Sequence, residues 1–165
     1  MVKLENPDFD KKSFIKKLES IIYLILVVPL IGFAWVFLEK ERQGALRSTF
    51  FDEPDIMFHS VMLIGVGYVL MRTIGTWKRD LLRSIERVEE LDLKLQLVKR
   101  PIIYRNLLWA FGGTIGAYGL YEKGDMLYAI IFTVFLILLT ANRPSPGYFI
   151  KLFKLKDEEK DWMQK

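Results

Sequence analysis

The stretch SIIYLILVVPLIGFAWVFL, residues 20–38, contains no charged side chain between Glu19 and Glu39. About 20 apolar residues are enough for an α-helix to cross roughly 30 Å of hydrocarbon. A segment this long and this apolar is more stable in lipid than in water. The stretch therefore predicts a transmembrane helix.

Three more apolar segments follow. They are residues 56–77, which contain His59 and Arg72; residues 101–121, which contain Arg105; and residues 126–142, which end before Arg143 and Pro144. Every backbone polar group in lipid must be paired, and none of the segments alternates like a strand of a β-barrel. We therefore expect an all-α, polytopic membrane protein whose four transmembrane helices form one domain over residues 1–165.

The composition supports this class only through its distribution along the chain. Of the 165 residues, 52% are hydrophobic and 27% are charged, which is ordinary for a soluble domain. Nearly all of the charge, however, lies between the four apolar segments. This pattern excludes a soluble enzyme domain and a disordered tail. Because the chain has no cysteine, a disulfide scaffold, a thiolate metal site and a cysteine nucleophile are excluded as well.

The basic residues indicate the orientation. Of the 24 Lys and Arg residues, only Lys40, Arg42, Arg47 and Lys123 lie in the loops after the first and third segments. Cytoplasmic loops carry the excess of Lys and Arg, and the number of predicted spans is even. We therefore expect both termini and the long linker in the cytoplasm, and a bacterial inner (plasma) membrane or its equivalent as the location.

Both ends of the chain are basic and amphipathic. The N-terminal segment, with Asn6 as its predicted helix cap, and the tail at residues 147–165 interleave apolar residues with lysines. Such segments lie along a membrane surface, where they contact anionic lipids or simply anchor the bundle. Nucleic acid is not an expected partner, because the basic residues lie beside apolar segments.

The linker at residues 78–100 is predicted to be helical and to carry one apolar stripe. The stripe consists of Leu81, Ile85, Val88, Leu91 and Leu95. A straight helix of this length would measure roughly 35 Å, whereas neighbouring spans lie only about 8 to 10 Å apart. The linker must therefore lie between distant spans or double back, with an extended return after Glu90 as one version. Either arrangement leaves the stripe exposed, and the candidates to cover it are the membrane surface, the tail helix, another copy of the chain and another subunit. Contact with a partner is favoured slightly over self-packing.

Small residues form one face of the third span. They are Gly112, Gly113, Gly116, Ala117 and Gly119. Small side chains let a second helix approach closely, so we expect helix packing within the bundle, with Gly65 and Gly67 of the second span as an opposing surface. A groove for a lipid tail, quinone or pigment, and a contact with a second protein, are the alternatives.

Arg72 and Arg105 reach a similar depth on consecutive spans, about 6 to 8 Å inside the cytoplasmic boundary. Two guanidinium groups at this depth would suit the phosphate of an anionic lipid. Snorkelling, in which the side chain lifts its charge to the headgroups, is the favoured alternative, because no acidic residue lies deep enough in a span to pair with them.

The sequence contains no pattern that equips a catalytic site. His59 is the single histidine, and we expect it to be hydrogen-bonded near the outer boundary rather than to bind a metal. There is no P-loop, no HExxH, no nucleophile elbow and no pair of carboxylates within the spans. The sequence therefore favours a non-catalytic protein without cofactor or metal over an enzyme.

These features lead to three functional hypotheses. The first is an accessory or assembly subunit that acts through helix and linker contacts in a larger membrane complex, with other subunits or further copies of itself as partners. The second is a small self-associating transporter or pore. The third is a protein that binds or modifies lipid headgroups through Arg72 and Arg105.

Overall fold

The computed structural model describes residues 9–46, 56–86, 88, 90–155 and 157–164, and every regular element in these residues is helical. The elements in chain order are α1 (Lys11–Arg42), α2 (Ile56–Leu70), the π-helical stretch η1 (Met71–Thr76), α3 (Trp77–Ile85), α4 (Leu91–Lys123), α5 (Met126–Ala141), α6 (Pro146–Phe153) and α7 (Asp157–Gln164). The expected all-α class is confirmed for the described residues.

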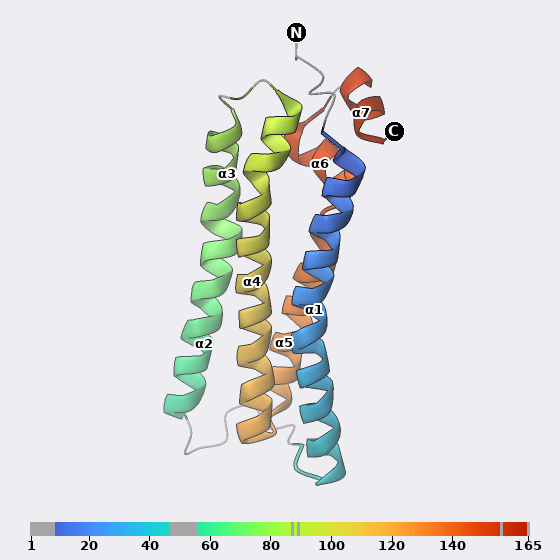
Figure 1. The fold of residues 1–165 in the computed structure, drawn as a ribbon. Helices are drawn as coiled ribbons and strands as arrows, with labels where there is room; N and C mark the ends of the chain where they lie inside the picture. The colour runs from blue at the N-terminus through green and yellow to red at the C-terminus, as the bar shows by residue number, and fades with distance from the viewer. Residues whose placement is uncertain (1–8, 47–55, 87, 89, 156, 165) are drawn as a thin grey trace.

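The helix α4 is the centre of the bundle. It contacts α5 most extensively, and it also contacts α1, α2 and α3. Figure 1 shows α4 between α1 on one side and α2 with α3 on the other, while α5 lies behind. The start of α1, the end of α3, the start of α4, and α6 with α7 lie at one end of the bundle, which we call the basic end.

Within the residues that the structure describes, two helices are long and apolar enough to cross a membrane: Lys11–Arg42 and the continuous helix Ile56–Arg83. The pair Met126–Ala141 and Pro146–Phe153, bent by 84°, adds a third if it is taken as one broken span. The helix α4 is less apolar, because Arg105, Asn106 and four glycines lie within residues 101–121. Among the described residues, length and composition thus show two, or up to three, helices that could cross a membrane, and the predicted four are not shown.

The helix α1 is longer than the apolar segment inside it. It begins after Asp10, whose side chain accepts a hydrogen bond from the Ser13 backbone N–H at 3.1 Å, and it continues through Pro29 to Arg42. The amphipathic N-terminal segment and the first predicted span therefore form one helix. The predicted cap at Asn6 lies outside the described residues.

The linker doubles back, as one of the two predicted arrangements required. The helix α3 continues the line of η1 outward, and α4 begins at Leu91 and returns (Figure 1). The prediction of an extended return after Glu90 is wrong, because the chain is helical from Leu91 onward. Both arms carry apolar residues on one side: α3 buries them against α4, and the start of α4 buries them against α3 and α1.

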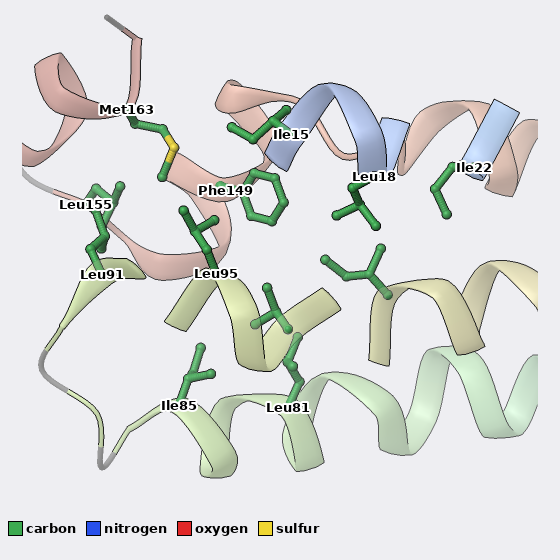
Figure 2. Close-up of a cluster of buried hydrophobic side chains, with 12 residues drawn as sticks. Ile15, Leu18, Ile22, Leu81, Ile85, Leu91, Leu95, Phe149, Leu155 and Met163 are labelled. Carbon is green, nitrogen blue, oxygen red and sulfur yellow. The ribbon is translucent and has the colours of Figure 1, made fainter. Parts of the chain in front are cut away.

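The expected exposure of the linker stripe is not found. Its residues Leu81, Ile85, Leu91 and Leu95 are at most 5% exposed, and Val88 is partly buried. Figure 2 shows Leu81, Ile85, Leu91 and Leu95 in one cluster with Ile15, Leu18 and Ile22 of α1, Phe149 of α6 and Met163 of α7. The apolar side of the tail also packs into this cluster, so linker, tail and N-terminal helix stabilise one another within the chain.

Candidate functional site

The π-helical stretch η1 joins α2 to α3 where the second apolar segment ends. A π-helix is rare and is found frequently at functional sites. Thr73 in this stretch is buried; its hydroxyl donates to the Val69 carbonyl at 2.7 Å and accepts from the indole N–H of Trp109 at 2.9 Å. The irregular stretch is therefore fastened to α4.

Arg105 of α4 lies beside η1 and is only 3% exposed. Its guanidinium carbon lies 4.0 Å from the ring centre of Trp77 and 4.5 Å from that of Trp109. Its Nη2 donates to the carbonyl oxygen of Asn142, at the C-terminus of α5, at 3.3 Å. Aromatic faces and the negative end of a helix thus stabilise this buried cation.

Tyr148 of α6 completes the surroundings of Arg105, with its ring centre 5.6 Å from the guanidinium carbon. It lies outside the four apolar segments. Burial raises the pKa of its phenol, while the charge of Arg105 acts in the opposite direction. The phenol is therefore neutral at neutral pH and leaves the positive charge of Arg105 in place.

The two arginines that the sequence paired lie in different surroundings. Arg105 is buried between the helices, so the expected exposure to lipid headgroups is not found for it. Arg72, on η1, is exposed and lines a cavity of about 420 Å³. The cavity has η1 and α3 on one side and α4 on the other. The second arginine at this cavity is Arg100, which the sequence analysis did not single out.

The cavity combines charge with an apolar wall. Besides the two arginines it is lined by Thr73, Trp77, Asp80, Leu81, Pro101, Tyr104 and Leu108. Its mouth reaches the surface, since Asp80 and Tyr104 are exposed together with both arginines. With two guanidinium groups and one carboxylate, the lining has a net positive charge, which favours an anion.

Trp77 forms a fixed wall of this cavity. Its indole N–H donates to the carbonyl oxygen of Pro101 at 3.1 Å, and its ring stacks on Arg105. The contacts of Arg105 with Trp77, Trp109 and Tyr148 were not predicted from the sequence. The one local signal was the spacing of Arg105 and Trp109, which places their side chains together on a helix.

At the opposite end of the bundle, His59 of α2 meets Tyr128 of α5. His59 Nδ1 lies 2.8 Å from the Tyr128 hydroxyl, the two rings stack, and both residues are buried. The prediction of a hydrogen-bonded histidine is confirmed. In the part of the chain that the structure describes, no three His, Cys, Asp or Glu residues are grouped in a way that could hold a metal ion.

We expect Tyr128→Phe to lower the free energy of unfolding by about 1 kcal/mol, because it removes a buried hydrogen bond between α2 and α5. Tyr68→Phe is the matched control, since Tyr68 is exposed. Unfolding in detergent, followed by circular dichroism, measures both. Equal effects of the two substitutions would show that the His59 contact contributes nothing.

The small-residue face of α4 packs against α5. A Cβ atom on Gly116 would lie 2.9 Å from the Tyr128 carbonyl oxygen, and Gly113 faces Phe132. Gly112 lies beneath the ring of Phe135 and Gly119 beneath that of Tyr128, while Ala117 is partly buried. The expected opposing glycines do not serve this role: Gly65 faces only the Ile115 side chain, and Gly67 faces open space.

One face of α4 stays exposed along its whole length, and we call it the open stripe. It consists of Leu93, Leu97, Arg100, Tyr104, Leu107, Phe111, Thr114, Tyr118 and Tyr121. The spacing alternates between four and three residues, which is the period of a helix seam that packs against another helix. In Figure 1 this helix runs between α1 and α2 with α3.

Comparisons of this chain with protein-family models, with curated proteins and with solved structures found no match.

Proposed function

We propose that this protein crosses the membrane four times and acts as an accessory or assembly subunit, by binding a transmembrane helix of another membrane protein along the open stripe of α4. The observation that carries the proposal is the stripe itself. It repeats every 3.5 residues on average, and it extends beyond the apolar part of its helix.

Four crossings are supported by the surroundings of α4 and α5. The helix α4 contacts both of the helices that are long and apolar enough to span, and α5 packs along α4. The one charged side chain in residues 101–121, that of Arg105, is buried between helices and not presented to lipid. With the excess of Lys and Arg at the basic end, this end is proposed to face the cytoplasm.

Lipid alone does not explain the whole stripe. Leu93 and Leu97 are 45% and 47% exposed, and they lie before residue 101, in the part of α4 proposed to extend into the cytoplasm. Exposed apolar side chains in water are unfavourable by about 25 cal/mol for each Å². An apolar helix that continues out of the membrane would cover both leucines together with Leu107 and Phe111.

The glycine face of α4 is not available for this contact, since α5 occupies it. The leucines of α3 and of the start of α4 that were expected to bind a partner are occupied as well, by the chain's own core. The open stripe is thus the surface of α4 to which the hypothesis of association now applies.

Photo-crosslinking in native membranes tests the proposal. A photoreactive amino acid at position 97 should capture a second, different membrane protein, whereas the same group at Leu24, on the exposed side of α1, should not. Identical capture from both positions, or none from position 97, would contradict a specific partner. Capture of a second copy of this chain would instead favour the self-associating transporter or pore, which solute flux into liposomes would then test.

A further inference from the structure

We infer that the cavity lined by η1 and α3 on one side and by α4 on the other binds the phosphate-bearing headgroup of an anionic amphiphile. Arg72 and Arg100 contact the phosphate, and the first carbons of the acyl chain lie against Leu108. The inference rests on the membrane location in the proposed function but not on the partner helix.

The charges at the cavity suit a phosphate. Arg72 and Arg100 come from the two walls, and both are exposed at the mouth. A guanidinium group offers a planar fork of donors that matches two phosphate oxygens, which gives stronger bonds than those between neutral groups. Among the described residues of the lining Asp80 is the one carboxylate, so the two arginines leave net positive charge.

The position of the cavity suits an amphiphile rather than a small anion. It lies where residues 56–77 end and residues 101–121 begin, the level proposed for the lipid headgroups. Trp77 and Leu81 on one side and Pro101 and Leu108 on the other give it an apolar wall. A volume of about 420 Å³ is within the range of small-molecule sites, and it holds a headgroup while the acyl chains stay in the bilayer.

The wall of the cavity is held in place by contacts within the chain. The Trp77 wall is held by its bond to the Pro101 carbonyl and by stacking on Arg105, whose buried charge adds positive potential behind the wall. Thr73, on the π-helical stretch, is held by Trp109. A wall fixed in this way loses little conformational freedom on binding, which favours affinity.

Binding of short-chain lipids to the purified full chain in neutral detergent tests the inference. The probes are dioctanoyl phosphatidylglycerol, dioctanoyl phosphatidylcholine and inorganic phosphate, measured by native mass spectrometry and by the shift of the unfolding temperature. We expect phosphatidylglycerol to bind most tightly, and the variant R72A/R100A to weaken it about tenfold or more.

Matched variants separate a site from general attraction. K16A/K17A removes the same charge from the same end of the bundle, at exposed residues of α1, and should leave binding unchanged. R72K/R100K keeps the charge but not the planar fork and should weaken binding by an intermediate factor. Leu108→Trp keeps both arginines, fills the apolar side and should also weaken binding.

Three results would overturn the inference. The first is no binding of phosphatidylglycerol to the unaltered chain. The second is an equal loss in R72A/R100A and K16A/K17A, which would mean general charge attraction. The third is inorganic phosphate binding as tightly as phosphatidylglycerol, which would mean a free-anion site. Arg100 and Tyr104 belong to the open stripe as well as to the cavity, so the partner helix is tested separately, by crosslinking at Leu97 in the chain with both arginines intact.

Discussion

Replacing Gly116 with leucine should separate α4 from α5 and destabilise the bundle by about 3 kcal/mol or more. A Cβ atom at this position would lie 2.9 Å from the Tyr128 carbonyl oxygen and 3.0 Å from the Phe132 nitrogen. Both are backbone atoms of α5, so neither can rotate away, and the helices must move apart. Because α4 and α5 form the most extensive contact in the bundle, the loss of packing extends beyond one residue.

Gly67→Leu is the control for this experiment, since a Cβ at Gly67 meets nothing within 4 Å. We expect it to change the free energy of unfolding by no more than about 0.5 kcal/mol. Gly116→Ala should fall between the two. Unfolding by sodium dodecyl sulfate in mixed micelles, followed by circular dichroism, gives the three values. A similar stability of the leucine variants at Gly116 and Gly67 would mean that the close approach of α4 and α5 is not present.

Arg105→Ala should have the second large effect, a decrease of about 3 kcal/mol in the free energy of unfolding. The substitution empties a buried volume between Trp77 and Trp109, and it removes the donor to the Asn142 carbonyl. Arg105→Met fills most of the volume without the charge, so we expect it to restore about half of the loss. If the methionine variant is as stable as the unaltered chain, packing explains the site and the cation is not required.

The tryptophans supply a second measurement for Arg105. Removal of a cation 4.0 Å from the centre of the Trp77 ring should shift the tryptophan fluorescence emission of the folded protein. Arg83→Ala is the control, because Arg83 is exposed on α3. We expect it to change neither the emission nor the free energy of unfolding by a measurable amount. An emission spectrum unaffected by Arg105→Ala would contradict the stacking.

The helices could be predicted because their signals are local. Residues 20–38 lie inside α1, residues 101–121 lie inside α4, and α5 covers nearly all of residues 126–142. A run without charge or breaking residues is visible in the sequence itself. Pro29 does not end α1. Proline is tolerated in transmembrane helices, because neighbouring helices and local adjustments of the backbone satisfy the polar groups that it leaves unpaired.

The burial of the linker could not be predicted, because it depends on segments far apart in the chain. Leu95 is buried by α1 and by the tail at Phe149, which no periodicity of the linker encodes (Figure 2). The surroundings of Arg105 could not be predicted for the same reason, since Trp77 and Tyr148 lie 28 residues before it and 43 residues after it. The glycine face was visible as a pattern, but its partner α5 was not.

The claim that α4 and its neighbours cross the membrane is tested most directly by labelling single cysteines with a maleimide that cannot cross lipid. The chain has no cysteine, so each variant carries one reactive group. In sealed cells Gln43→Cys and Glu122→Cys should react, whereas Lys12→Cys, Lys99→Cys and Lys154→Cys should react only after the membrane is opened. All five positions are exposed. Reaction of Lys99→Cys and Glu122→Cys from the same side would contradict the account, because α4 would then not cross the membrane.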